Sequence, residues 1–452
     1  PYYERELSFR IARSYGAGRY DATYEQKGID YPIGYVRFTE GRNIEEFVRL
    51  LAQERISLSD IITHEIPFAQ AAEAYEMITK NPNHERYIGV LLKYDENDTK
   101  WQSRIENPKA KRAASGEKIR LGLIGAGNFV RSTMLPIMKE TGLFEFRGLA
   151  TTGGVGGAQA NDGTPFGYTT NNYQELLSDP EIDLILCAIG GDDTYRLAPY
   201  LFETGELQRA VTQKPFLGFS DTTIDHFMLR KVGLPTFYGQ AFLPDVCELS
   251  RTMLPYTRQY FEELLTTGRI RCIRPSDTVY ESRKNFGESQ LGTPLAAKKL
   301  GGFRLLQGSG QFSGEILGGC IDSIFDMFDP SRYADMPEIC RKYGLFPPKE
   351  EWQGRILLLE SSEEQMAPAK YQKALEYLKD AGVFAAVSGV LVGRPMDGVW
   401  QAEYEQLLRQ VIDDPALPVV CGLNVGHALP RCIVPLGGPA RVDVQAQKIE
   451  FL

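Results

Sequence analysis

Three polar side chains that lie far apart in the sequence could form a hydroxyl–imidazole–carboxylate triad. Thr194 stands in "CAIGGDDTYRLAPYL", where an apolar run stops at two glycines and a helix is expected to begin. Strand, tight turn, hydroxyl and helix is the order that presents a nucleophile above a sheet. His427, in "NVGHALPRC", and Glu360, at the end of "GRILLLE", each follow another apolar run. A hydroxyl beside an imidazole that a carboxylate orients can attack an amide carbonyl.

Each of these residues also has a simpler interpretation. A Ser or Thr at a helix start is the ordinary N-cap, and Asp192 and Asp193 could cap the same helix. Glu360 could begin a helix and interact favourably with its dipole. His226, in "TTIDHFMLRK", lies in an expected helix, where a lone His usually packs or meets solvent. The residues alone leave open whether Thr194 is a nucleophile, a cap or the relic of a nucleophile.

A second motif, "GAGNFV", could bind a dinucleotide. It follows the apolar run "KIRLGLI" and precedes a helical pattern, so Gly125 and Gly127 could let the backbone approach a pyrophosphate. Val130 replaces the third glycine, and the next strand ends "LATTGG" without an acid for a ribose hydroxyl. The alternative is a tight strand-to-helix turn that needs Gly for its conformation.

Composition narrows the class of protein. The chain has 452 residues, more than one hydrophobic core usually supports, with 43% hydrophobic and 24% charged residues. Its net charge of −9 argues against nucleic acid or an anionic membrane as a partner. Its seven cysteines are odd in number and form no CxxC pair, which predicts reduced thiols in the cytoplasm and no structural metal site.

The pattern of elements predicts an α/β protein in several pieces. Residues 1–95 read as an α+β fragment, followed by a polar linker over 96–117. Alternating strands and helices over 118–270 predict a parallel-sheet, Rossmann-like lobe with the Gly-rich turn and the nucleophile turn. A long polar segment at 271–304 is expected to cover the substrate, and 305–452 form a strand-rich α/β C-terminal lobe.

From about residue 178 to the end, the chain resembles the LD-carboxypeptidase family of serine peptidases, closest to its microcin-C-immunity branch. The stretches that carry this resemblance are "DPEIDLILCAIGGDDTYRLAPYL", "FLGFSDTT", "GLPTFYGQAFLPDVCEL", "GGCIDSIFDMF", "GRILLLESSEE", "SGVLVGRP" and "NVGHALPRCIVPLG". The resemblance implies a cofactor-independent hydrolase on two lobes, usually a homodimer. It implies cleavage of an amide near a free carboxylate, in a cell-wall L,D-peptide or a peptidyl-nucleotide.

The resemblance also implies roles for individual residues. The family's serine falls on Thr194, its acid on Glu360 and its imidazole on His427, and backbone N–H groups near Gly191 and Tyr195 would form the oxyanion hole. Because a β-branched Thr restricts χ1, a Thr in place of the nucleophilic Ser predicts reduced activity.

Two further resemblances concern the N-terminal part. Residues 118–177, with "KIRLGLIGAGNF" and "YTTNNYQELLSDPEID", resemble the Rossmann half of Gfo/Idh/MocA oxidoreductases. Residues 1–95 resemble the C-terminal end of a medium-chain alcohol dehydrogenase, as found in bi-domain oxidoreductases. Two alternatives to a hydrolase follow: an NAD(P)-dependent oxidoreductase that uses the Gly125–Gly127 turn, and a catalytically inactive hybrid.

Overall fold

The chain forms two compact units, divided between Gln102 and Ser103, inside the predicted 96–117 linker. A computed structural model describes residues 4–5, 15–81, 83–94, 103–107, 110, 118–124, 135–142, 144–151, 166–182, 184–205, 207–208 and 214–452. Among the described helices, none has the length and apolarity needed to cross a bilayer.

The first unit contains a parallel strand–helix–strand motif with little interior. Strand β1 pairs in parallel with β2, and α3 connects them. Ala74 is the one buried apolar side chain among the unit's described residues, while Tyr35, Ile33 and Ile88 are at least 70% exposed. Its elements are α1 (Ala22–Glu25), α2 (Glu40–Ala52), β1 (Ile62–Pro67), α3 (Ala71–Thr79) and β2 (Gly89–Lys93).

An eight-stranded sheet forms the centre of the second unit. Its four middle strands are parallel neighbours, and the remaining strands extend both edges in antiparallel pairing. In spatial order the strands are β10 (Cys272–Ile273), β20 (Lys448–Phe451), β19 (Pro439–Asp443), β14 (Gln311–Cys320), β15 (Ile356–Glu360), β16 (Gly389–Gly393), β17 (Val419–Leu423) and β13 (Arg304–Gln307).

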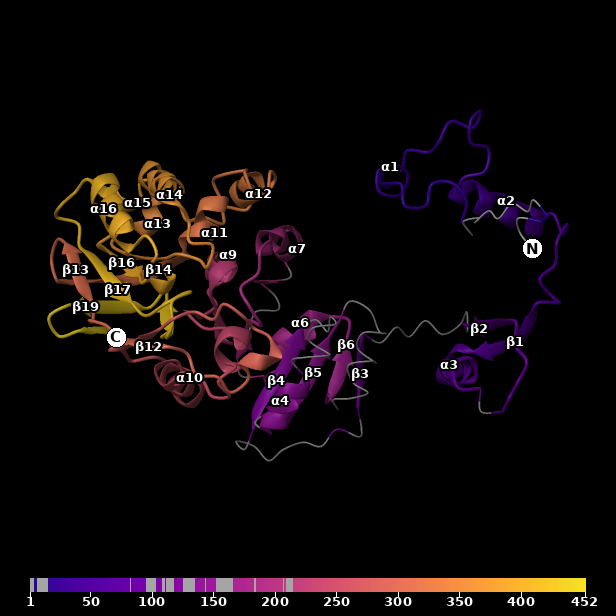
Figure 1. Cartoon of the computed structure of the whole chain (residues 1–452), viewed down its shortest axis with the longest axis horizontal. Helices are drawn as coiled ribbons and strands as arrows, with labels where there is room; N and C mark the ends of the chain where they lie inside the picture. The colour runs from indigo at the N-terminus through magenta and orange to yellow at the C-terminus, as the bar shows by residue number, and fades with distance from the viewer. Residues whose placement is uncertain are drawn as a thin grey trace. The chain divides into compact units, whose positions relative to one another are not determined.

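Helices cover one face of this sheet (Figure 1). Side chains of α9, α11, α14 and α16 join the sheet residues in one apolar core. The helices around this core are α9 (Thr223–Arg230), α11 (Ile321–Asp326), α12 (Met336–Lys342), α13 (Lys349–Trp352), α14 (Pro368–Asp380), α15 (Val383–Ala386) and α16 (Gln401–Ile412).

A second, four-stranded sheet and helix α10 (Pro255–Thr267) cover the opposite face through a separate apolar core. The four strands, in spatial order, are β18 (Val434–Leu436), β9 (Thr236–Tyr238), β8 (Phe216–Gly218) and β7 (Ile185–Leu186). The unit is therefore a layered α/β structure, which confirms the predicted mixed class.

Strand β15 shows how the sequence divides its side chains between the two cores. Leu357 and Leu359 pack among the helices, while Ile356 and Leu358 pack toward the four-stranded sheet. Successive strand residues point to opposite faces, so the run "ILLLE" is apolar throughout because both faces are covered. Glu360 shares its face with Ile356 and Leu358, and this places its carboxylate beside the four-stranded sheet.

The predicted 118–270 lobe divides its described strands between two sheets. Strands β7, β8 and β9 are parallel neighbours in the sheet just described, and β4, β5 and β6 are parallel neighbours in a further sheet that β3 extends. The strands of this further sheet and the helices beside them are β3 (Arg104–Glu106), β4 (Ile119–Ile124), α4 (Leu135–Thr141), β5 (Phe144–Ala150), β6 (Tyr168–Thr170) and α6 (Tyr173–Ser178). The parallel pairing is present, and a single Rossmann-like lobe stays a prediction.

The polar segment 271–304 contains the hairpin of β11 (Thr278–Tyr280) and β12 (Ala297–Lys299). The backbone N–H of Tyr280 donates to the carbonyl of Leu429, two residues beyond His427. The segment thus lies beside the loop of the predicted imidazole, and its role as a substrate cover stays a prediction.

Candidate active site

Glu360 and His427 meet as the sequence predicts. The Glu360 carboxylate is buried at the end of β15, and its Oε2 accepts from the backbone N–H of His427 at 3.1 Å. The same oxygen lies 2.9 Å from Nδ1 of the imidazole. A buried carboxylate needs donors, and here one residue supplies two of them, which fixes the ring through both its backbone and its side chain.

Gly426 makes this approach possible. Its φ of +77° is in the left-handed region, which Gly adopts at little cost. A Cβ at this position would lie 2.1 Å from Oε2 of Glu360. The glycine before His427, already visible in the sequence, therefore serves close packing of the loop against the carboxylate.

The hydroxyl at the imidazole belongs to Ser220. Its Oγ lies 3.0 Å from Nε2 of His427. Ser220 follows β8 and Phe219, has a φ of +67°, and opens the short 3-10 helix η4 (Ser220–Thr222) before α9. This strand–turn–helix geometry with a left-handed backbone at the serine is the nucleophile turn that we expected at Thr194.

Tyr238 connects the serine to the carboxylate. Its hydroxyl donates to Oε1 of Glu360 at 2.5 Å and accepts from the backbone N–H of Ser220 at 3.1 Å. Both Glu360 oxygens therefore have donors, and the turn that carries Ser220 is held against the same carboxylate.

The prediction that Thr194 supplies this hydroxyl is wrong. The Thr194 hydroxyl donates to the backbone carbonyl of Asp221 at 3.1 Å, and its backbone N–H donates to Oδ2 of Asp221 at 3.0 Å. Thr194 is the first residue of a 3-10 helix, η3 (Thr194–Leu197), whose N-cap is Asp193, so Thr194 is not the N-cap of the simpler interpretation either. Thr194 thus holds Asp221, the residue after Ser220, and its hydroxyl is bonded there and not to the imidazole. The reduced activity expected from Thr194 stays a prediction.

The signal for Ser220 was present in "KPFLGFSDTT", an apolar run that ends at a serine with helix-start residues after it. His226, six residues later, is buried between Phe216 and Tyr238, and its Nε2 contacts the Gly218 carbonyl. Burial lowers the pKa of His226 to about 3, so it is a neutral packing residue.

Of the two residues predicted to supply oxyanion-hole N–H groups, only Gly191 lies in the described wall of the cleft. Gly191 lies in the wall of the cleft that Ser220 also lines. Tyr195 is fully buried, its hydroxyl donates to Asp335 at 2.7 Å, and it is absent from the described cleft wall. Gly125 and Gly127 lie outside the described residues, so the dinucleotide turn stays a prediction.

Glu363 is a residue that the sequence interpretation missed. Its Oε2 lies 2.9 Å from Nε2 of His427, on the same nitrogen that Ser220 approaches. Burial opposes the charged imidazolium, but Glu360 and Glu363 outweigh it and raise the pKa of His427 to about 9. The hydrogen bond from His427 lowers the pKa of Glu363 to about 2. In this state His427 is a cation held between two carboxylates.

One group of possible metal ligands occurs among the residues described: Cys320, Glu360 and His427, whose ligand atoms lie within 4.8 Å of one another. Burial and the neighbouring Glu360 raise the pKa of the Cys320 thiol well above its usual value, which keeps it protonated. Glu360 and His427 already satisfy each other, so these residues suit a triad, and the metal-free hydrolysis expected from the sequence stays a prediction.

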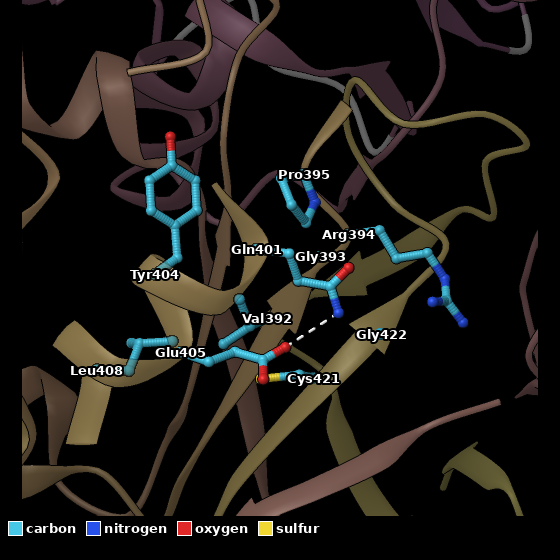
Figure 2. Close-up of a pocket in the computed structure, with 10 residues that line it drawn as sticks. All are labelled: Val392, Gly393, Arg394, Pro395, Gln401, Tyr404, Glu405, Leu408, Cys421 and Gly422. Carbon is cyan, nitrogen blue, oxygen red and sulfur yellow. Dashed lines mark hydrogen bonds between the residues drawn. The ribbon is translucent and has the colours of Figure 1, made fainter. Parts of the chain in front are cut away.

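A second pocket, at the ends of β16 and β17, has a different character (Figure 2). Gln401 Nε2 donates to Oε1 of Glu405 at 3.1 Å, and the Arg394 guanidinium points away from this pair and donates to the Gly301 carbonyl. Burial raises the pKa of Cys421 to about 12. The wall of this pocket thus contains no activated nucleophile or base.

The site agrees with the comparisons with known proteins. The model of the LD-carboxypeptidase N-terminal domain matches residues 169–239, which include Ser220, and that of the C-terminal domain matches 313–442, which include Glu360 and His427. A solved MccF-like protein from Streptococcus pneumoniae, in complex with AMP, is 47% identical; the match covers 74% of this chain and 98% of that chain, with a TM-score of 0.66. The chain belongs to the LD-carboxypeptidase family.

Two further relatives share less of their sequence with this chain. The microcin C7 self-immunity protein MccF of Escherichia coli is 28% identical over 287 residues, 62% of this chain and 76% of that protein. A structure of MccF in complex with aspartyl sulfamoyl adenosine, at 22% identity and a TM-score of 0.54, covers 76% of this chain and 97% of that chain and shows a shared fold.

A different, partial similarity links the chain to an acetaldehyde dehydrogenase of Chloroflexus aurantiacus. The two are 26% identical over 197 residues, 42% of this chain and 60% of that protein. The oxidoreductase and alcohol-dehydrogenase resemblances of the N-terminal part, and NAD(P) binding with them, stay predictions.

Replacing Gly426 with Ala should separate Glu360 from His427. Since the new Cβ would lie 2.1 Å from the carboxylate, the loop or the carboxylate must move, and hydrolysis of an L,D-peptide should fall roughly 100-fold. Gly437→Ala is the control, because its φ of +79° is similar and no atom lies within 4 Å of the added carbon. Equal rates in the two variants, measured with their thermal unfolding, would contradict the packing described here.

Replacing Glu363 with Gln should lower the pKa of His427. The lost negative charge no longer stabilises the imidazolium, so the pKa of His427 should fall below about 9. NMR titration of the imidazole Cε1–H resonance measures it, and the chain has only four histidines to assign.

Glu364→Gln is the matched control for this titration. Glu364 is also exposed, but it pairs with Arg332 at 3.2 Å. If both variants, or neither, shifted the His427 titration, Glu363 would have no specific effect on the imidazole.

Proposed function

We propose that this protein is a serine-type amide hydrolase in which Ser220 is the nucleophile, His427 the general base and Glu360 the residue that orients the base. The observation that carries the proposal is the continuous chain of contacts Ser220 Oγ–His427 Nε2 at 3.0 Å and His427 Nδ1–Glu360 Oε2 at 2.9 Å. These distances are within hydrogen-bonding range for a nucleophile, its base and the group that holds the base.

In the acylation step, Ser220 Oγ attacks the amide carbonyl carbon while Nε2 of His427 takes the hydroxyl proton. Glu360 accepts from Nδ1–H and stabilises the imidazolium as it forms. The imidazolium then gives the proton to the leaving nitrogen, the C–N bond breaks, and an acyl ester remains on Ser220. Water, deprotonated by His427, attacks this ester and releases the acid.

Backbone N–H groups would stabilise the oxyanion of the tetrahedral intermediate. The residue after the nucleophile in such a turn normally supplies one donor, and here it is Asp221. Thr194 holds both the carbonyl and the carboxylate of Asp221, so it would act as a positioning residue for this donor. Gly191, across the same cleft, would supply the second donor.

The base must be neutral before it can accept the serine proton. With Glu363 on Nε2, the imidazole is charged and cannot act. Glu363 has a side chain that is 62% exposed, so it is free to turn toward solvent or substrate. Substrate entry would therefore include displacement of Glu363 from the imidazole.

The substrate class follows from the family. The Streptococcus pneumoniae relative was solved with AMP and MccF with aspartyl sulfamoyl adenosine, so a peptidyl- or aminoacyl-nucleotide amide is the proposed substrate, with an L,D-linked peptide as the alternative. A homodimer is expected from the family resemblance and stays a prediction.

Substitutions at the two candidate hydroxyls distinguish the two assignments. Ser220→Ala should reduce hydrolysis of an aminoacyl-nucleotide or L,D-peptide by a factor of at least roughly 1,000, because the reacting oxygen is lost. Thr194→Ser should leave the rate within about threefold of the parent, since the hydroxyl that contacts Asp221 remains.

A large increase in Thr194→Ser would restore the assignment made from the sequence. Undiminished hydrolysis by Ser220→Ala would end the proposal, provided that the variant is shown to be folded by its circular dichroism spectrum. Thr194→Val removes the hydrogen bond from the Thr194 hydroxyl to the Asp221 carbonyl. This variant should have a lower kcat, while the Ser220 hydroxyl stays in place.

A further inference from the structure

Carboxylates dominate the wall of the cleft in front of Ser220. A single guanidinium, that of Arg332, accompanies them in the described wall. The acids that line the cleft are Asp192, Asp221, Asp322, Asp326, Glu363 and Glu364. Such a wall attracts a cation and repels a carboxylate.

Most of these acids already have partners within the protein. Asp192 pairs with Arg332 and accepts from the Tyr333 hydroxyl at 2.6 Å, and Glu364 pairs with Arg332 at 3.2 Å. Thr194 donates to Asp221 through its backbone N–H. These contacts satisfy Asp192, Glu364 and Asp221 and leave Asp322 and Asp326 to be explained.

Asp322 and Asp326 each retain one oxygen without a donor. They lie four residues apart on α11, on one face of the helix, and are 4% and 5% exposed. Asp322 Oδ2 accepts from the backbone N–H of Ser362 at 2.9 Å, whereas Oδ1 of Asp322 and Oδ1 of Asp326 have no hydrogen-bond partner among the described residues. A buried carboxylate oxygen without a donor is costly, so a donor from a ligand would be bound strongly.

Among the described residues, the two cations that act on Asp326 leave its Oδ1 without a hydrogen bond. Arg332 lies 3.6 Å from Oδ2 of Asp326 and is shared with Asp192 and Glu364. Lys370, on α14, acts on Asp326 through its charge and lies over the Phe325 ring, 4.7 Å from the centroid. Burial still raises the pKa of Asp326 to about 6.

We propose that the cleft binds a substrate ammonium group between Asp322 and Asp326, so that the protein acts on amides whose acyl part has a free amine. This inference rests on the proposed hydrolase function, because it places the ammonium in the cleft that Ser220 lines. It deepens that function by favouring acyl groups that carry an ammonium. The aspartyl group of the MccF ligand carries an ammonium too, but also a side-chain carboxylate, which this acidic wall would repel.

The substrate ammonium would also help to release His427 from Glu363. An ammonium in this cleft is a competing partner for Glu363, whose carboxylate now contacts His427 Nε2. When Glu363 turns to the ammonium, the imidazole loses one of the two carboxylates that keep it charged. A substrate with an amine would thereby favour the neutral base that its own cleavage requires.

Binding to a Ser220→Ala form of the full chain tests the proposal without turnover. Four amides are compared by calorimetry at millimolar concentration: hexanamide without an amine, norleucinamide with an α-amine, Nα-acetyl-lysinamide with a side-chain amine, and lysinamide with both. At least one amine-bearing amide should bind at least about tenfold tighter than hexanamide, and the comparison identifies which amine is recognised.

Asp322→Asn and Asp326→Asn, each added to Ser220→Ala, should remove most of this preference. Glu338→Gln is the charge-matched control, because Glu338 is an exposed acid on α12 and does not line the cleft. Equal affinity for hexanamide and all three amines, or no binding of any amine, would overturn the proposal. An amine preference that persists in both Asn variants would also overturn it.

The comparison of the four ligands uses unaltered carboxylates, so it holds even if an Asn variant fails to fold. The two proposals fail separately. If Ser220→Ala shows the amine preference but the parent chain hydrolyses no amide or aminoacyl-nucleotide, the ammonium site stands and the hydrolase function does not.

Discussion

The buried carboxylate of Glu360 is the constraint around which the candidate active site is arranged. It lies at the end of a strand with apolar layers on both sides, where an ionised group without donors would be strongly unfavourable. Three donors satisfy it: the backbone N–H and Nδ1 of His427 and the hydroxyl of Tyr238. Because each donor comes from a different segment than the carboxylate, satisfying this one charge brings together β9, β15 and the loop after β17.

The layers of the second unit explain why the Ser220 hydroxyl lies at the same place. The face of β15 that presents Glu360 is covered by the sheet that contains β8 and β9. Tyr238 ends β9, and its hydroxyl accepts from the backbone N–H of Ser220 just beyond β8. Thr223, at the start of α9, donates to the Ser220 carbonyl and accepts from the Cys320 N–H, which ties the turn to the end of β14. The serine is thus fixed by its backbone, and its side chain is left for the imidazole.

The sequence predicted for a physical reason that Glu360 and His427 meet, and the structure brings them together. A carboxylate at the end of a fully apolar strand must have a partner, and His427 was the histidine that followed a comparable strand. The hydroxyl at the imidazole was expected at Thr194 and is found at Ser220, because both residues follow an apolar run and precede a helix. The two differ in backbone conformation, since Ser220 has a φ of +67° and Thr194 begins a 3-10 helix. A left-handed φ is unfavourable for a β-branched residue, so a serine suits that turn better than a threonine.

Other features depend on tertiary contacts that no local pattern reports. The α/β class follows from alternating strands and helices, but the division of β4–β6 and β7–β9 between two sheets depends on which strands pair. Glu363 is one of two exposed acids in "LLLESSEEQ", and only the folded loop shows that it reaches His427. The unpaired oxygens of Asp322 and Asp326 likewise become visible only once α11 is placed beside the cleft.

Covalent labelling with a fluorophosphonate tests most directly whether Ser220 is the activated hydroxyl. Trypsin cuts after Arg196 and Arg209, so Thr194 and Ser220 fall on different peptides, and mass spectrometry can assign the adduct. We predict one adduct, on the peptide of residues 210–230 at Ser220, which His427→Ala abolishes. An adduct on Thr194, or labelling of Ser220 that persists without His427, would contradict this account.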